Sequence, residues 1–466
     1  MTKSHIHFLG ICGYAVSGAA LLARELGYTV TGSDDHAYPP TTDILTQAGI
    51  AWVDGSSVEN LTRWGRPAEV VVGNQTRRQN PEWLAALELG LPVISEIEFY
   101  ARLSADRMRL AICGTHGKTT TTALVAHMLN SAGMNPGLRL GSTSLDLGVS
   151  ARLGSGPFVF EGDEYTSAPW DPRPKFLHMA PHAACVTNLE LDHPDIYPSL
   201  DAYRAPFIEL ARSMSSDGVL VLCGDDAEAR GLASHASCRV VTYGEHPDAD
   251  WRISATGSDA RHQHVSLHGA VDVEDVAITF PGRHTAANAP AALILSTVAG
   301  APLDVAVAAC ADFRGPARRF QVLGDGDGVT VVDDYAHHPT ECGAALAAAR
   351  QRYPARRIIG LHTPHTYSRT LTLLQDYAPV FADCDLAIIG PVEAARERGQ
   401  PETVTNFDVA AVVTAPHDVR TVGTPEEALR LLVDECRPGD VVVTLSLGGF
   451  DKFAPRLLAA LQARHG

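Results

Sequence analysis

The stretch at 109–131, RLAICGTHGKTTTTALVAHMLNS, decides the fold. Its apolar start predicts a buried strand, and the apolar spacing from residue 121 onwards predicts a helix. The glycines between them let successive backbone N–H groups converge on one phosphate at the positive N-terminus of that helix. Lys118 adds an ammonium group, and Thr119 offers a hydroxyl to Mg²⁺. The usual spacing would need a glycine at Ile112, so we predict a shortened phosphate-binding loop, made of Gly114, Thr115, His116, Gly117, Lys118, Thr119 and Thr120.

Strand and helix patterns alternate on both sides of this stretch. Short apolar runs at 5–9, 28–32, 51–53 and 69–73 are separated by helical patterns. Similar series start at 109 and at 329, and alternation of this kind predicts parallel sheets covered by helices. We therefore predict an α/β protein with a Rossmann-like domain over 1–107, a P-loop ATPase-like central domain over 108–315 and a Rossmann-like domain over 316–466.

Composition limits the possible partners. The 466 residues carry a formal charge of −17, which opposes non-specific binding to nucleic acid or to an anionic membrane. The chain has no apolar run of membrane-spanning length and no basic-then-apolar leader at its start. Nine cysteines are scattered without CxxC spacing, which is typical of apolar fillers in a reducing compartment. We expect a cytoplasmic protein that acts on small molecules.

Acidic residues and a histidine follow two further strands of the central region. Glu161-Gly162-Asp163-Glu164 ends one apolar run, and Asn188-Leu-Glu-Leu-Asp-His193 follows the next. The carboxyl ends of parallel strands meet where open α/β sheets bind ligands. Mg²⁺ needs only one or two carboxylates beside phosphate oxygens. These clusters therefore predict a magnesium site beside the phosphate-binding loop, although a lone acidic cluster is more often a solvated loop.

The first and third regions also carry polar motifs at strand ends. GICGYAVSG at 10–18 lies between a strand and a helix, but it breaks the GxGxxG pattern, which disfavours a hydride-transfer cofactor. In the third region, Asp333-Asp334-Tyr-Ala-His337-His338 follows a strand. Neighbouring side chains in extended chain point apart, so a two-histidine metal site is disfavoured and substrate or proton handling fits better. The Arg318-Arg319 pair could place a guanidinium on transferring phosphate.

Taken in order, these motifs resemble the Mur ligase family over nearly the whole chain. The resemblance implies phosphorylation of a carboxylate by ATP and attack of an amine on the acyl phosphate. It implies ATP and Mg²⁺ as cofactors, with metal ligands Thr119, Glu161 and His193. Asn288 would contact adenine, although Thr285 replaces the family's usual asparagine. The C-terminal domain would bring Arg319 and Asp334 to ATP on closure. The catalytic set would be Lys118, His193, Arg319, Asp334 and His337, and the substrate-binding set Gly10, Cys12, Gly13, Ser17, Asp34, His337, His338 and Arg369.

The resemblance leaves the amine substrate open. Phe207 stands where several family members carry a carbamylated lysine, as in branches that accept UDP-N-acetylmuramate itself. Tyr38-Pro-Pro, Glu164-Tyr165 and Gly448-Gly-Phe resemble the branch that reattaches the recycled tripeptide L-Ala-γ-D-Glu-meso-diaminopimelate, which we favour. PHTYSRT at 364–370 instead resembles the L-alanine-adding branch, with Thr366 in place of an arginine. A specialised metabolite, a non-catalytic UDP-sugar sensor and an NAD-dependent oxidoreductase remain alternatives. We expect a monomer or weak homodimer.

Overall fold

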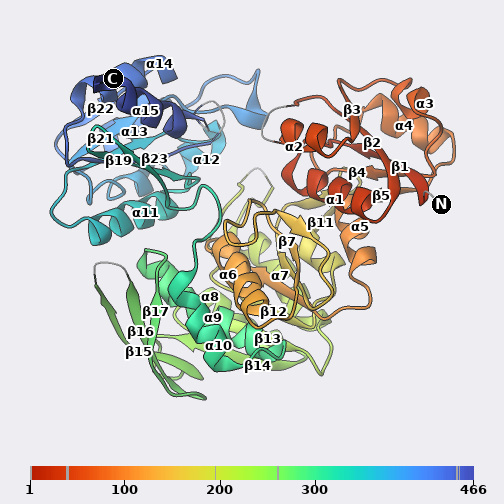
Figure 1. Cartoon of the computed structure of the whole chain (residues 1–466), viewed down its shortest axis with the longest axis horizontal. Helices are drawn as coiled ribbons and strands as arrows, with labels where there is room; N and C mark the ends of the chain where they lie inside the picture. Colours follow the sequence, from red (N-terminus) through yellow and green to blue (C-terminus); the bar gives the residue numbers. More distant parts are fainter. Residues whose placement is uncertain are drawn as a thin grey trace.

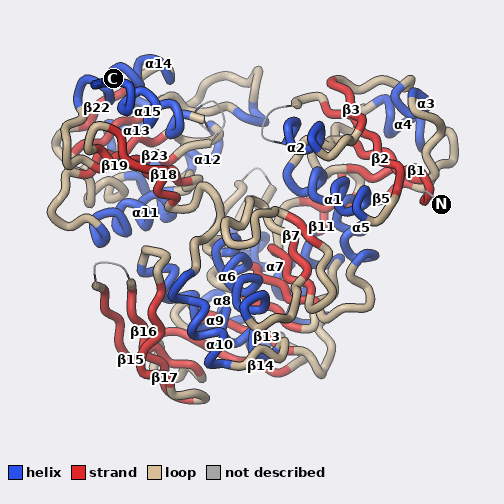
Figure 2. The backbone as a smooth tube through the Cα atoms, viewed as in Figure 1, coloured by secondary structure: helices blue, strands red, loops and turns tan. Residues whose placement is uncertain are grey.

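The computed structural model describes residues 3–37, 41–194, 196–259, 262–447, 450 and 452–465. Three sheets lie in three lobes, which we call the N-terminal, central and C-terminal lobes (Figure 1). Strands form the middle of each lobe, with helices packed around them (Figure 2). The mixed α/β class and its three-lobed organisation are confirmed.

The N-terminal lobe has an all-parallel sheet in the order β3-β2-β1-β4-β5. Its strands are β1 (Lys3–Leu9), β2 (Tyr28–Asp34), β3 (Ala51–Asp54), β4 (Glu69–Val72) and β5 (Val93–Ser95). Its helices are α1 (Tyr14–Glu25), α2 (Thr41–Gln47), α3 (Asn60–Arg63), α4 (Pro81–Glu88) and α5 (Glu96–Leu103). Because α5 begins directly after β5, with Ser95 and Glu98 forming a capping box, the first residue of the helix is held at the sheet edge.

The central lobe has a ten-stranded sheet in the order β17-β16-β15-β14-β13-β12-β6-β9-β7-β8. The strands are β6 (Arg109–Cys113), β7 (Gly137–Arg139), β8 (Ala151–Arg152), β9 (Phe158–Glu161), β12 (Ala183–Val186), β13 (Val219–Cys223), β14 (Arg239–Gly244), β15 (Trp251–Ser258), β16 (Gln263–Gly269) and β17 (Val273–Ile278). A separate hairpin pairs β10 (Thr166–Ala168) with β11 (Asp171–Pro174). The helices are α6 (Lys118–Ser131), α7 (Leu200–Ser213), α8 (Ala227–Gly231), α9 (Arg283–Val298) and α10 (Leu303–Ala309). Helix α6 is buried from Thr119 to Leu129, so it lies inside the lobe.

The C-terminal lobe has a six-stranded sheet in the order β18-β19-β23-β20-β21-β22, with β18 antiparallel to β19. The strands are β18 (Gln321–Gly326), β19 (Val329–Asp334), β20 (Ile358–His362), β21 (Leu386–Ile389), β22 (Val419–Thr421) and β23 (Val441–Leu445). The helices are α11 (Pro339–Arg352), α12 (Tyr367–Thr372), α13 (Asn406–Val412), α14 (Pro425–Glu435) and α15 (Phe453–Gln462).

The structure differs from the predictions in two local features. Strands β15, β16 and β17 form an antiparallel meander at one edge of the central sheet, which the β-rich sequence alone did not predict. Helix α6 begins at Lys118, three residues before the predicted start, because Gly117 ends the loop at φ +82°. The boundaries near 107 and 316 stay predictions. Within the described part of the chain, no helix combines the length and apolar character needed to cross a bilayer.

Candidate functional site

The glycine-rich loop between β6 and α6 has a backbone that only glycine accommodates. Gly114 and Gly117 have φ values of +119° and +82°. A Cβ atom at Gly114 would lie 2.4 Å from Thr187 Oγ1, and one at Gly117 would lie 2.6 Å from Asn288 Nδ2. Because Gly117 is the N-cap of α6 and has no side chain, the first N–H groups of that helix face outward for a ligand.

The loop is held by the segment that follows β12. The Thr115 amide donates to the Asn188 carbonyl oxygen at 2.9 Å, and the His116 amide donates to Asn188 Oδ1 at 2.9 Å. The Thr115 hydroxyl also donates to the Glu190 carbonyl oxygen at 3.0 Å. These bonds fix the loop before any ligand binds, which lowers the cost of ordering it around phosphate.

Lys118 and Thr119 each face a carboxylate from the acidic segment 161–164, which begins at the last residue of β9. Lys118 Nζ lies 3.0 Å from Glu164 Oε2, and the Thr119 hydroxyl donates to Glu161 Oε1 at 2.7 Å. Burial alone would lower the pKa of Lys118, but Glu164 and Glu161 raise it, so the ammonium stays charged. The other Glu161 oxygen accepts from the Gly141 amide at 2.7 Å. A hydroxyl and a carboxylate side by side at a phosphate loop are the oxygen ligands that suit Mg²⁺.

His193 contacts neither Thr119 nor Glu161, with which it was predicted to share a metal ion; in the described structure its ring nitrogens face Glu164 and Arg369. Its Nε2 is 2.9 Å from Glu164 Oε1, and its Nδ1 is 2.9 Å from Arg369 Nη2 of the C-terminal lobe. The same Arg369 nitrogen lies 2.8 Å from Asp192 Oδ1. In this structure, therefore, the predicted metal set separates into a Thr119–Glu161 pair and a neighbouring His193 that contacts Glu164. The metal role of His193 stays a prediction.

A cavity of about 580 Å³ lies between the central and C-terminal lobes, beside the glycine-rich loop. It brings together Thr119 and Asn288 of the central lobe with Arg319 and Asp334 of the C-terminal lobe. The cavity is lined by His116, Gly117, Thr119, Thr120, Asn188, Leu189, Glu190, Leu191, Leu200, Asp226, Phe280, His284, Asn288, Arg319, Phe320, Asp334, Ala336, Thr340, Glu341, Ala344 and Ala345. Its volume is in the range of small-molecule sites.

Fixed polar groups surround this cavity. Asn288 Oδ1 accepts from the Tyr243 hydroxyl at 2.9 Å, which fixes the direction of the amide. Asp334 accepts from the amides of Phe320 and Ala336, both at 2.7 Å. Burial raises the pKa of Asp334 to about 6, with Arg319 acting in the opposite direction. The cavity therefore has an oriented amide on its central-lobe side and an arginine and a carboxylate on its C-terminal side.

The two lobes contact each other through His116. Its Nε2 is 2.8 Å from Glu190 Oε2 within the central lobe, and its Nδ1 is 3.2 Å from Glu341 Oε1 at the start of α11. Thr340 donates its hydroxyl across the same gap to Glu190 at 3.0 Å. Burial alone would lower the pKa of His116, but hydrogen bonds to Glu190 and Glu341 raise it to about 9. A protonated His116 therefore connects the glycine-rich loop to the C-terminal lobe.

The paired histidines of the C-terminal lobe do face different neighbours. The His338 ring lies 4.8 Å from the His116 ring, centroid to centroid, and the His337 ring lies 5.6 Å from that of His365. Burial, and then Arg369, lower the pKa of His337 well below its ordinary value, so its imidazole is neutral. The two side chains face different neighbours, and the expectation that they do not share one metal ion stays a prediction.

The predicted N-terminal set gathers where β1 and β2 end and α1 begins. Gly10 has φ +73°, and the Gly13 amide donates to its carbonyl oxygen at 3.1 Å. The Cys12 amide donates to Asp34 Oδ2 at 2.8 Å, while the Ser17 hydroxyl donates to the Tyr14 carbonyl. The structure brings these residues into one turn, but it tests no role for them. The motif at Tyr38-Pro39-Pro40 lies outside the described residues, as do Gly448 and Gly449.

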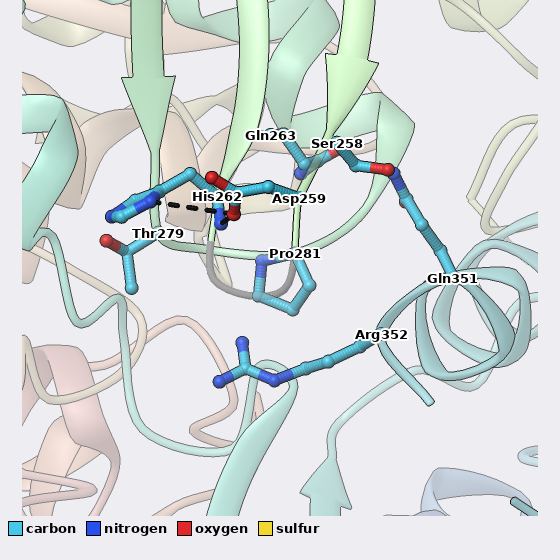
Figure 3. Close-up of a pocket in the computed structure, with 8 residues that line it drawn as sticks. All are labelled: Ser258, Asp259, His262, Gln263, Thr279, Pro281, Gln351 and Arg352. Carbon is cyan, nitrogen blue, oxygen red and sulfur yellow. Dashed lines mark hydrogen bonds and ion pairs between the residues drawn. The ribbon is translucent and has the colours of Figure 1, made fainter. Parts of the chain in front are cut away.

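A second pocket, of about 20 Å³, lies where hairpin β15–β16 meets the end of α11 (Figure 3). Gln351 and Arg352 of α11 face Ser258 and Pro281 there. Asp259 Oδ1 accepts from the His262 amide at 2.7 Å. This volume holds about one water molecule, which excludes a nucleotide. The large cavity beside the glycine-rich loop is therefore the candidate site.

Several residues of the site were not among the predicted site residues. Glu164 contacts both Lys118 and His193, and Asp192 pairs with Arg369. Both stand in the acidic motifs already noted, where the sequence could not say which carboxylate faces which cation. Glu341 lies four residues after His337, in the first turn of α11. Its closeness in sequence to the histidine motif could have marked it as a site residue. Tyr243 lies next to the last residue of β14, and a position near a strand end was a weaker signal.

Comparisons with known proteins agree with this geometry. The chain matches the Mur ligase family catalytic domain over 5–108, the Mur ligase middle domain over 112–296 and the Mur ligase glutamate ligase domain over 318–448. It is 37% identical to the UDP-N-acetylmuramate–L-alanine ligase of Roseiflexus sp. over 95% of this chain and 96% of that one. It is also 37% identical to the enzyme of the same name from Chloroflexus aggregans, over 98% of each chain.

Two solved structures have the same three-lobed fold. A murein peptide ligase from Psychrobacter arcticus is 29% identical, with a TM-score of 0.75 over the full length of both chains. The UDP-N-acetylmuramate-alanine ligase of Thermotoga maritima has a TM-score of 0.82 at 24% identity, covering 99% of this chain and 100% of that one, which shows the fold. With matched domains in all three lobes and relatives of this similarity along the whole chain, the protein belongs to the Mur ligase family and is an ATP-dependent amide ligase.

Proposed function

We propose that the protein joins the carboxylate of UDP-N-acetylmuramate to the amine of L-alanine through an acyl phosphate, with release of ADP and phosphate. The names of the full-length relatives support this substrate pair. The observation that carries the proposal is the position of Lys118, Thr119 and Glu161. They lie at the N-terminus of α6, beside a cavity that the C-terminal lobe closes.

The residues present fit ATP and Mg²⁺. Gly114 and Gly117 form a tight loop in which any side chain would collide with Thr187 or Asn288, and Thr119 and Glu161 offer adjacent oxygens. Thr119 and Glu161 would hold the ion, which when bound neutralises charge on the phosphates. Lys118 would place its ammonium on the transferring phosphate, and Asn288 would contact adenine from the far side of the cavity. Arg319 would add positive charge from the C-terminal lobe, where the developing anionic charge needs it.

The first chemical step forms a bond between a carboxylate oxygen and the γ-phosphorus while the bond to ADP breaks. In the second step the amine nitrogen attacks the acyl carbon, and inorganic phosphate leaves. The amine must lose a proton, and His337 is a neutral imidazole in the C-terminal lobe that could accept it. Asp192, whose pKa is lowered by His193 and Arg369 against the effect of burial, stays anionic and could orient the amine.

A second candidate acceptor is the recycled tripeptide, and one observation favours it. Arg369, which would hold a carboxylate of the amine substrate, already pairs with Asp192 at 2.8 Å. Its Nε and Nη1 atoms, the Thr366 hydroxyl and His338 Nε2 are buried without a hydrogen-bond partner in the described part of the chain. These atoms include donors for a neutral amide, but the pairing of Arg369 with Asp192 leaves little uncompensated positive charge for a free carboxylate. A peptide N-terminus, in which an amide follows the amine, would fit it.

The N-terminal turn around Gly10, Gly13 and Asp34 would bind the UDP-sugar, because glycine turns at the ends of parallel strands accept phosphates. We place the reaction in the cytoplasm, with the protein as a monomer or weak homodimer.

One experiment tests the proposal. The protein is incubated with ATP, Mg²⁺ and UDP-N-acetylmuramate, with L-alanine or the tripeptide offered separately, and the products are weighed by mass spectrometry. We expect a condensation product and equimolar ADP only when all components are present. ADP release without an amine would contradict the proposal, and the mass of the product decides between the acceptors. Tight UDP-sugar binding with no product would select the sensor alternative.

A further inference from the structure

Three buried charged side chains, Glu96, Arg139 and Lys175, and the half-buried Asp163 lie together between the N-terminal and central lobes. Glu96, the first residue of α5, is 1% exposed, Arg139 at the end of β7 is 3% exposed and Lys175 is 4% exposed. Arg139 Nε donates to Glu96 Oε1 at 2.8 Å, and Lys175 Nζ donates to Asp163 Oδ2 at 3.1 Å. The Arg139 guanidinium also lies 5.5 Å from the centre of the Tyr100 ring. The two acids and two bases compensate one another in pairs.

One of these side chains reaches the candidate metal site. Arg139 Nη1 donates to the carbonyl oxygen of Glu161 at 3.1 Å. The carboxylate of the same Glu161 accepts the Thr119 hydroxyl at 2.7 Å. Hydrogen bonds therefore run from Glu96 of the N-terminal lobe, through Arg139, to the backbone of Glu161, the residue whose carboxylate faces the phosphate-binding loop.

A lysine at position 139 could not make the same contacts as Arg139. Its planar guanidinium holds a carboxylate along one edge while another nitrogen reaches the carbonyl, whereas a single ammonium on a flexible stem has no such fixed geometry. Burying Glu96, Arg139 and Lys175 is also a costly way to close an interface, since apolar residues of similar volume often stabilise as well or better. A role in orientation accounts for the cost.

We propose that Glu96 and Arg139 are positioning residues that hold the Glu161 carboxylate toward the divalent ion, and so connect the UDP-sugar lobe to the metal site. The inference rests on the proposed function for the identity of the ligands. Glu161 would bind the ion, and Arg139 would act through the Glu161 backbone without touching substrate. Partners that orient metal ligands in this way commonly affect metal affinity strongly.

The test compares Arg139→Lys with Arg109→Lys. Arg109 begins β6, which pairs with β9, and it also donates to backbone carbonyls, those of Ser104 and Met179. Within the described part of the chain it has no hydrogen bond or ion pair with residues 161–164. Binding of Mn²⁺ in the presence of ADP is measured by electron paramagnetic resonance, without UDP-sugar or amine. We expect Arg139→Lys to weaken Mn²⁺ binding by about tenfold or more. Arg109→Lys should bind Mn²⁺ as the unsubstituted protein does.

Glu96→Gln provides a second variant in case Arg139→Lys folds poorly, because it keeps the side-chain shape and leaves Arg139 in place. It should weaken Mn²⁺ binding in the same direction and lower kcat, with KM for the UDP-sugar unchanged. Folded variants with unaltered Mn²⁺ affinity would overturn the inference, even if their thermal midpoints fell. Because Mn²⁺·ADP binding needs no turnover, the result stands apart from the outcome of the product assay.

Discussion

The two interfaces of the central lobe are built differently. Toward the N-terminal lobe, buried charges are paired, Glu96 with Arg139 and Lys175 with Asp163, and Tyr100 packs against Phe158 with ring centroids 6.2 Å apart. Toward the C-terminal lobe, one buried pair, Asp192 with Arg369, lies near a cavity of about 580 Å³, and Arg369 Nε and Nη1 have no hydrogen-bond partner in the described part of the chain. Buried polar groups normally have hydrogen-bond partners, so an interface with a cavity and unpaired donors is one that a bound ligand would complete. We infer that the C-terminal lobe is the part that moves during turnover.

The largest effect on turnover is expected from removal of the Lys118 ammonium group beside the glycine-rich loop. Lys118→Met should lower kcat by at least about 10³-fold, because a preorganised charge on the transferring phosphate is lost. ADP release in the complete reaction measures this. Lys3→Met, at an exposed lysine of β1, is the matched control and should leave the rate unchanged. More than a tenth of the original activity in Lys118→Met would remove Lys118 from the phosphate site.

The next prediction compares how much a charged residue at each of the two interfaces contributes to the free energy of unfolding. Glu96→Leu leaves Arg139 and Lys175 with fewer anions in a buried setting, and should cost about 3–5 kcal/mol of unfolding free energy. Glu190→Gln, at a half-exposed carboxylate facing the other interface, should cost about 1 kcal/mol or less. Thermal unfolding of both variants without nucleotide is the measurement. Equal shifts in the thermal midpoints of the two variants would show that the two interfaces do not differ in this way.

A smaller effect is expected from pH. The pKa of His116 is raised from 6.5 to about 9 by Glu190 and Glu341 against the effect of burial. Its contribution to lobe closure is therefore complete below pH 6.5 and is lost as pH rises through about 9. Small-angle scattering without ligands should show a larger radius of gyration at pH 10 than at pH 7.5. His116→Asn should lack this change, and a response that persists in that variant would assign it to other groups.

The smallest effect is expected at the far side of the cavity. Asn288→Ala should weaken nucleotide binding about fivefold, the loss of one oriented hydrogen-bonding group, with kcat nearly unchanged. Tyr243→Phe, which removes only the hydroxyl that orients Asn288, should have a weaker effect in the same direction. Titration with a fluorescent ADP analogue measures both. Unchanged affinity in Asn288→Ala would exclude the amide from the nucleotide site.

The sequence predicted those parts of the fold that depend on local pattern. Strands such as β6 and β12 were found because parallel strands buried on both faces are continuous apolar runs. The antiparallel pairing of β15, β16 and β17 was not predicted, because an apolar run does not show which strand it pairs with or in which direction. The start of α6 was missed because its first turn, Lys118 to Thr121, is polar and carries no helical periodicity.

In the candidate site, too, the features set by local sequence could be predicted, and the contacts between distant segments could not. The glycine-rich loop was predictable because its chemistry is contained in seven consecutive residues. Contacts between distant segments were not, since 176 residues separate His193 from Arg369 and 225 separate His116 from Glu341. His193 also has a φ of +54°, a backbone feature that no sequence pattern indicated.

The central claim is that a carboxylate is activated by phosphoryl transfer at the glycine-rich loop. UDP-N-acetylmuramate labelled with ¹⁸O in its carboxylate tests this most directly, with the released phosphate analysed by mass spectrometry after one round of product formation. The account predicts one ¹⁸O atom in each phosphate, because the oxygen that attacks phosphorus leaves with it. Phosphate without ¹⁸O, or label recovered in AMP, would contradict it.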